Sequence, residues 1–203
     1  MLTAFTAGLL LITVSELGDK TFFIAAVLAM RHSRRLVFAG AVTALAAMTI
    51  LSVLVGKAAS FLPQHYINYA EIALFIGFGL KLLYDASQMP TRSDCGEAKE
   101  AMVAVNEAES KMGRITPLAV LIQAFVMTFM AEWGDRTQFA TITLAASYNS
   151  AGVTTGAILG HGICAAIAVL GGRLIAKHIS ERTMTALGGM LFLIFAVVAA
   201  IGK

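Results

Sequence analysis

Long apolar runs are the feature of this sequence that most restricts its fold. A helix of about 20 apolar residues can cross the hydrocarbon core of a bilayer, and the sequence holds several runs of that kind. Only 13% of its residues are charged, whereas about a quarter are charged in soluble domains. We therefore expect an all-α integral membrane protein with six transmembrane helices. The expected spans cover residues 2–30, 36–60, 67–86, 115–147, 152–176 and 183–202.

Basic residues in the expected loops predict the orientation, because cytoplasmic loops of membrane proteins are enriched in Lys and Arg. They follow the first, third and fifth spans: Arg31, Arg34, Arg35, Arg92, Lys99, Lys111, Arg114, Lys177 and Arg182. These loops are expected to face the cytoplasm, with both termini outside. The lipid bilayer is the expected surrounding, and the net charge of +3 gives no indication of a nucleic-acid partner.

One long polar stretch, residues 87–114, separates two apolar parts of the chain. Its apolar residues recur at helical spacing and would suit a surface helix. These residues are Ala98, Met102, Val105, Ala108 and Met112. The favoured interpretation is nevertheless a mobile cytoplasmic connector between residues 1–86 and residues 115–203.

The two apolar parts are copies of each other. The sequence ELGDKT at 16–21 recurs as EWGDRT at 132–137, and the GA pair at 40–41 recurs at 156–157 with the same spacing. Each part holds three expected spans, an odd number, so the second would enter the membrane from the opposite side. We therefore expect two inverted three-helix repeats, an arrangement in which secondary transporters bind substrate between the repeats near the bilayer midplane.

Each copy of the motif places ionisable side chains inside an apolar span. A charge there costs about 3 kcal/mol on insertion scales. On a continuous helix Glu16, Asp19 and Lys20 would share one face, and the same holds for the second motif. Such a face is expected to point toward the protein interior or a water-filled cavity.

These charges allow two interpretations. The pairs Glu16–Lys20 and Glu132–Arg136 could be (i, i+4) ion pairs that stabilise the bundle, but they leave one acid over in each half. If the motifs meet, four carboxylates face the two cations Lys20 and Arg136. The four are Glu16, Asp19, Glu132 and Asp135. Their excess negative charge in a low dielectric requires a divalent cation or protons, and this functional interpretation is favoured.

The residue types of the motifs indicate which cation would suit them. Carboxylates without His or Cys favour hard ions such as Ca²⁺, Mn²⁺ or Mg²⁺ over zinc or copper. Gly18 and Gly134 could let the helix unwind so that backbone carbonyls add ligands, although close helix packing explains them equally well. Thr21 and Thr137 would become ligands only if the helix breaks.

The doubled motif E-x-G-D-K/R-T, once in each three-helix half, resembles the hallmark of the Gdt-type divalent cation/proton exchangers. That family includes Golgi Ca²⁺/Mn²⁺ transporters and bacterial manganese exporters. The resemblance spans nearly the whole chain and implies cation/proton exchange at Glu16, Asp19, Glu132 and Asp135. The protein would be a transporter of Mn²⁺ or Ca²⁺ and not an enzyme, with no permanent cofactor. Since no long targeting extension precedes the first span, a bacterial plasma membrane is expected.

Protons are expected to drive the metal outward by alternating access. Four clustered carboxylates beside two cations cannot all stay ionised once the metal leaves, so protons should take its place. A passive cation channel is the main alternative, because channels also use acidic rings. An intramembrane aspartyl protease is less favoured, because that class expects a glycine where Glu16 and Glu132 stand.

Other polar residues in the spans are expected to have structural roles. His161 is expected to be a neutral, hydrogen-bonded packing residue, since Leu45 is its counterpart in the first half. Gln123 and Gln138 are expected to form hydrogen bonds between helices. Glu71 and Asp85 lie near the ends of the third span, where interfacial water should solvate them.

Overall fold

The computed structural model is helical over most of the residues that it describes, which are 1–89, 96–110, 116–175 and 180–201. The helices are α1 (Leu2–Glu16), α2 (Lys20–Arg31), α3 (Arg34–Ala59), α4 (Gln64–Gln88), α5 (Gly96–Ser110), α6 (Pro117–Ala131), α7 (Arg136–Ser147), α8 (Ser150–Ile175) and α9 (Glu181–Ile201). Helices satisfy their backbone hydrogen bonds internally, as a lipid environment requires. The expected all-α fold class is confirmed.

Four of the described helices are long and apolar enough to cross a membrane, namely α3, α4, α9 and, over Ser150–Gly171, α8. Helices α6 and α7 together form a fifth candidate span that is bent by 74°. Helix α1 has 15 residues, and a helix of that length is only about 22 Å long, shorter than a bilayer core of about 30 Å. The chain is therefore a multi-pass membrane protein.

The expected spans 2–30 and 115–147 are each interrupted at their motif. The first breaks between Glu16, the last residue of α1, and Lys20, the first residue of α2. The second breaks over residues 132–135, between α6 and α7. The prediction that the charges of each motif share one face of a continuous helix is therefore wrong.

Glycine is the physical reason for both breaks. Gly18 and Gly134 each have a φ of +82°, a left-handed conformation that costs glycine little and other residues more. Asp19 and Asp135 follow with extended backbones and become the N-caps of α2 and α7. The expected helix break at these glycines is confirmed, and ligation of a cation by backbone carbonyls stays a prediction.

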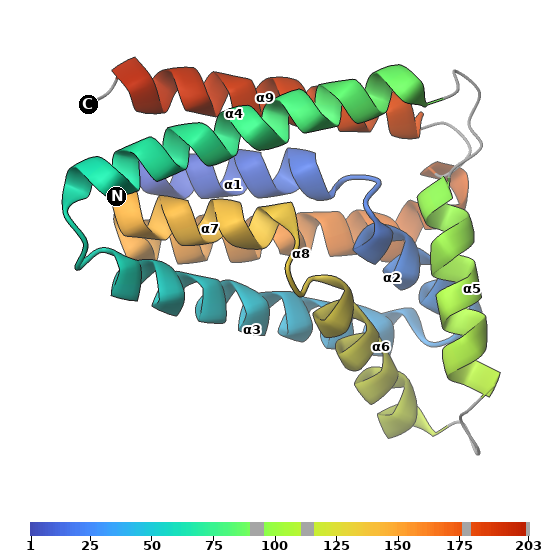
Figure 1. Cartoon of the computed structure of the whole chain (residues 1–203). Coiled ribbons are helices and arrows are strands. Elements are labelled where there is room, and N and C mark those ends of the chain that lie inside the picture. Colours follow the sequence, from blue (N-terminus) through green and yellow to red (C-terminus); the bar gives the residue numbers. More distant parts are fainter. Residues whose placement is uncertain (90–95, 111–115, 176–179, 202–203) are drawn as a thin grey trace.

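Equivalent helices of the two halves have matching lengths. Helices α1 and α6 have 15 residues each, α2 and α7 have 12, and α3 and α8 have 26. Figure 1 shows α1, α3, α4, α7, α8 and α9 side by side, with both termini at one end and α5 across the other. Helix α1 packs on α8, whereas α6 and α7 pack on α3. The broken helix pair of each half thus lies against the long helix of the other half.

The repeated GA pairs mark these crossings. A Cβ atom added at Gly40 of α3 would lie 2.6 Å from the carbonyl oxygen of Leu121 in α6. A Cβ at Gly156 of α8 would collide with the carbonyl oxygen of Phe5 in α1. Small residues let helix backbones approach closely, so these contacts fix the level at which the halves meet.

The polar stretch 87–114 is more ordered than the favoured interpretation of a mobile connector predicted. Its residues Gly96–Ser110 form α5, which packs on α2. Ala101 and Val105 are fully buried in the cluster that α2 also contributes to. The surface-helix alternative is therefore correct for this part. Some residues of the expected loops and linker lie outside the described residues: Arg92, Cys95, Lys111, Met112, Arg114 and Lys177.

Candidate cation-binding site

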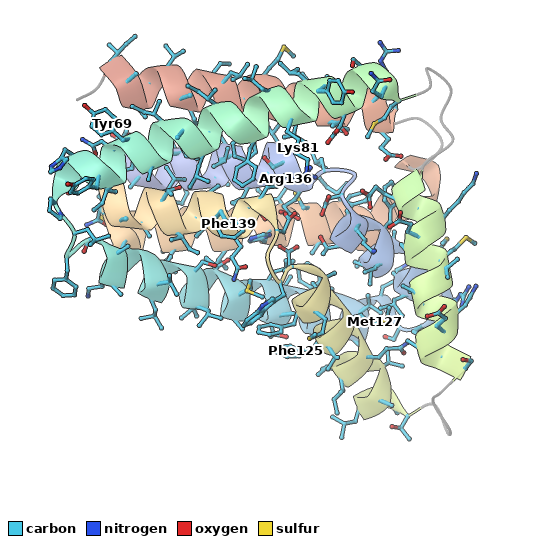
Figure 2. All side chains as sticks on the ribbon, viewed as in Figure 1. Tyr69, Lys81, Phe125, Met127, Arg136 and Phe139 are labelled. Carbon is cyan, nitrogen blue, oxygen red and sulfur yellow. The ribbon has the colours of Figure 1, made fainter. Side chains whose placement is uncertain are left out.

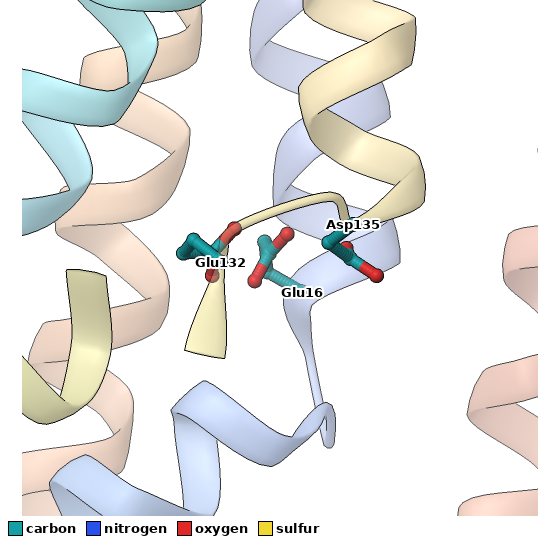
Figure 3. A group of neighbouring side chains, drawn as sticks. All are labelled: Glu16, Glu132 and Asp135. Carbon is teal, nitrogen blue, oxygen red and sulfur yellow. The ribbon is translucent and has the colours of Figure 1, made fainter. Parts of the chain in front are cut away.

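Three carboxylates from the two motifs meet between the halves. One oxygen each from Glu16, Glu132 and Asp135 lies within 4.8 Å of the others. Figure 3 shows Glu16 between Glu132 and Asp135. Glu16 ends α1, Glu132 is the C-cap of α6, and Asp135 is the N-cap of α7. The two helix breaks therefore bring the acids of both motifs to one point.

The two glutamates are buried with free oxygen atoms. Each is 2% exposed, and the Oε1 atom of each has no hydrogen-bond partner in the described part of the chain. The Thr21 hydroxyl donates to Glu16 Oε2 at 3.2 Å. The Thr137 hydroxyl donates to Asp135 Oδ2 at 3.0 Å and lies 3.5 Å from Glu132 Oε2. Because a buried polar atom without a partner is costly, the free oxygens can accept a cation or protons.

Asp19, the fourth predicted carboxylate, lies outside this group of three. Arg136 reaches across from the other motif, and its Nη2 atom donates to Asp19 Oδ1 at 2.8 Å. Figure 2 labels Arg136 at the start of α7, beside the loop that joins α1 to α2. The negative charge of Asp19 is therefore balanced within the protein, whereas no ion pair to Glu16, Glu132 or Asp135 is found among the described residues.

The ion pairs differ from those that a continuous helix would make. Lys20, predicted as a partner of Glu16, instead lies 3.2 Å from the carboxylate of Glu100 on α5. Arg136, predicted as a partner of Glu132, instead pairs with Asp19. The interpretation of the motifs as local (i, i+4) pairs is therefore wrong, because the breaks separate the residues that a helix would have aligned.

A cavity of about 110 Å³ adjoins Asp19 and Arg136. Acids from several helices line it: Asp19, Asp85, Glu97 and Glu181. Burial, followed by the charges of Asp19 and Glu181, raises the pKa of Glu97 to about 7. Burial disfavours the charged carboxylate and the neighbouring acids add to this effect, so Glu97 binds a proton more readily than an exposed glutamate does.

Gln138 supports the second helix break. Its Oε1 atom accepts the backbone N–H of Gly134 at 2.8 Å, and its Nε2 atom donates to Met48 Sδ at 3.1 Å. The interhelical hydrogen bond predicted for Gln138 is therefore confirmed. Gln123 differs, because its Nε2 atom lies 3.9 Å from Met127 Sδ on the same helix.

Two further polar residues, His161 and Glu71, are buried. His161 is 5% exposed and lines a second cavity with Glu16 and Cys164. This burial is consistent with the packing role expected for His161, but its Nδ1 atom has no hydrogen-bond partner among the described residues, so the hydrogen bond expected there is not observed. Glu71 is fully buried, and Ser147 donates to it at 2.6 Å. The expectation that interfacial water solvates Glu71 is therefore wrong.

Sequence reasoning missed the acidic residues that approach the motifs from other helices. Glu97 and Glu100 belong to α5, and Glu181 begins α9. A usable signal was present, since Glu97 and Glu100 are three residues apart and adjoin the apolar positions Ala101 and Val105 on a helix. That pattern indicates an acidic edge beside a docking face.

Comparison with known proteins gives consistent matches. The profile of a family described as "Divalent cation/proton antiporter GDT1" matches residues 4–90 and 120–203. The GDT1-like protein sll0615 of Synechocystis is 60% identical over 201 residues, which cover 98% of this chain and 97% of that protein. The PAM71-homolog, chloroplastic, of Arabidopsis thaliana is 43% identical over 98% of this chain. The chain spans 60% of that protein's length. No solved structure matches the chain.

Proposed function

Since this chain belongs to the GDT1 family of divalent cation/proton antiporters, we propose that it exports Mn²⁺ or Ca²⁺ from the cytoplasm in exchange for protons. It is a transporter and not an enzyme, and the cation and protons are its substrates. The observation that carries the proposal is the grouping of the buried Glu16 and Glu132 with the half-buried Asp135, within 4.8 Å. Three carboxylates without a cation form a ligand set for a hard divalent ion.

We assign cation binding to the four motif carboxylates, Glu16, Asp19, Glu132 and Asp135. Glu16, Glu132 and Asp135 already form the group of three described above. Asp19 would join them when Arg136 releases it. Lys20 and Arg136 balance charge. Gly18 and Gly134 supply the breaks, and the Thr21 and Thr137 hydroxyls orient carboxylate oxygens, as their hydrogen bonds support.

Charge neutralisation explains why the two substrates would exchange. A bare group of carboxylates is costly inside a membrane, so a carrier reorients readily only when metal or protons neutralise it. Metal bound from one side and protons bound from the other then move in opposite directions. Alternating access of this kind couples the two fluxes without a continuous pore.

We further propose that the chain crosses a bacterial plasma membrane six times, as two inverted repeats over residues 1–86 and 115–203. The matching helix lengths support the repeat. In Figure 1, α3 runs toward the end that holds the termini and its counterpart α8 runs away from it, which supports the inversion. The linker 87–114 would then lie in the cytoplasm and both termini outside.

Cysteine labelling tests this topology. In a background with Cys95→Ser and Cys164→Ala, Arg34→Cys should react with an impermeant maleimide only in inverted vesicles, and Asn149→Cys only in intact cells. The two positions stand at equivalent places in the two halves, at the start of α3 and just before α8, so inversion puts them on opposite faces. Labelling of both from one face would contradict the inverted arrangement.

Ion selection tests the proposed substrate. In liposomes with an imposed pH gradient, Mn²⁺ or Ca²⁺ should accumulate against its own gradient, and Zn²⁺ should not, because the site offers only oxygen ligands. Initial rates with radiolabelled ions give the preference between Mn²⁺ and Ca²⁺. Flux that follows only the metal gradient, whatever the pH difference, would instead support a passive channel.

A further inference from the structure

The two basic residues of the motifs make different contacts. Arg136 of the second motif pairs with Asp19 of the first, at 2.8 Å. Lys20 occupies the equivalent position in the first motif. If the two motifs made equivalent contacts, Lys20 would pair with Asp135. Its Nζ atom instead lies 3.2 Å from Glu100 Oε2 on α5, a helix that lies between the two halves in the sequence. The contact with α5 therefore makes the site asymmetric.

This asymmetry determines which carboxylates are available. Asp19, paired with Arg136, lies outside the group of three. Asp135 accepts hydrogen bonds from the backbone and hydroxyl of Thr137, at 3.3 and 3.0 Å, and belongs to that group. An ammonium group placed on Asp135 would neutralise a ligand of the site, as the guanidinium group does at Asp19. Lys20 is thus a potential competitor of the cation.

Helix α5 holds its acidic residues in fixed positions along α2. At one end Glu100 contacts Lys20. At the other end Glu109 contacts Arg31 Nη1 at 2.6 Å and His32 Nε2 at 2.8 Å. Burial alone would raise the pKa of Glu109, but hydrogen bonds from His32 and Arg31 hold it below its usual value. The buried apolar residues of α5 lie between these contacts, so α5 is attached to α2 along most of its length.

We infer that Glu100 is a positioning residue that holds Lys20 away from the cation site while the site loads, and that transfer of Lys20 from Glu100 to Asp135 promotes cation release. The inference rests on the proposed cation-binding role of Glu16, Glu132 and Asp135. Transfer of Lys20 would give Asp135 an ion pair like the one that Arg136 already makes with Asp19. Each cation of the two motifs would then neutralise the aspartate of the opposite motif.

The strength of the Lys20–Glu100 contact suits a pair that must break in every cycle. The two side chains are 42% and 66% exposed. Exposed ion pairs change an equilibrium constant by up to about fivefold. A contact of this size biases the position of Lys20 without locking it, so loss of the contact should weaken cation binding by a similar factor.

The test compares four variants of the full-length protein: Glu100→Gln, Lys20→Gln, the double variant, and the control Glu107→Gln. Glu107 is an exposed acid of the same helix. Binding of Mn²⁺, and separately of Ca²⁺, is followed through the fluorescence of Trp133, the single tryptophan, which adjoins Glu132. Transport in liposomes then gives KM and kcat separately.

Glu100→Gln should raise Kd and KM for the cation about three- to fivefold with little change in kcat, and Glu107→Gln should leave both constants unchanged. The double variant should recover the wild-type Kd, because no lysine remains to compete, and this recovery also shows that the protein is folded. A wild-type Kd for Glu100→Gln, or a double variant as weak as Glu100→Gln, would overturn the inference. A wild-type protein that binds neither ion would overturn the proposed function as well.

Discussion

Asp135→Asn is expected to reduce divalent cation transport at least about a hundredfold, because loss of a residue that only orients a metal ligand already costs about 10- to 100-fold, and loss of a charged ligand itself costs more. Asp19→Asn should have a comparable effect if Asp19 joins the site during the cycle. The substitution keeps the side-chain shape and removes only the charge. Initial rates in liposomes at saturating Mn²⁺, with protein amount matched, measure the loss.

Two comparisons make this result specific to the site. Glu107→Gln removes an exposed carboxylate of α5 and should transport normally. Lys20→Gln should slow turnover less than either aspartate variant, since lysine balances charge and does not bind the metal. Normal transport by both aspartate variants would rule out the proposed site.

Collapse of the pH gradient is expected to stop uphill metal export. The family exchanges divalent cations for protons, and inward protons would neutralise the carboxylates that outward metal leaves behind. Acidification of the outer side should therefore accelerate metal efflux, and a protonophore should suppress export against a metal gradient. A pH-sensitive dye should report proton movement opposite to the metal.

The control for this experiment is Asp135→Asn protein in the same liposomes, which should show neither metal flux nor metal-dependent proton movement. Leakage of the membrane would appear equally in both preparations. Continued uphill export with the pH gradient collapsed, and with no other ion gradient present, would exclude proton exchange. The carboxylate site could survive that outcome, because the aspartate variants test it separately.

The sequence alone determined the membrane setting, the duplication and the identity of the carboxylates. Apolar runs predict helices because the bilayer offers no other backbone partner. The recurrence of ELGDKT as EWGDRT is enough to mark Glu16, Glu132 and Asp135 as candidate ligands. Such features depend on composition and on spacing along the chain, which can be read directly.

Only the tertiary structure decided how these residues meet. Helical periodicity predicted that Glu16 would align with Lys20 and Glu132 with Arg136. The left-handed conformations at Gly18 and Gly134 instead turn the chain, so Lys20 contacts Glu100 and Arg136 contacts Asp19. The partner residues are 80 and 117 positions apart in the sequence. Local spacing predicts contacts three or four residues apart on one helix, whereas contacts between distant segments depend on how those helices break, cross and pack.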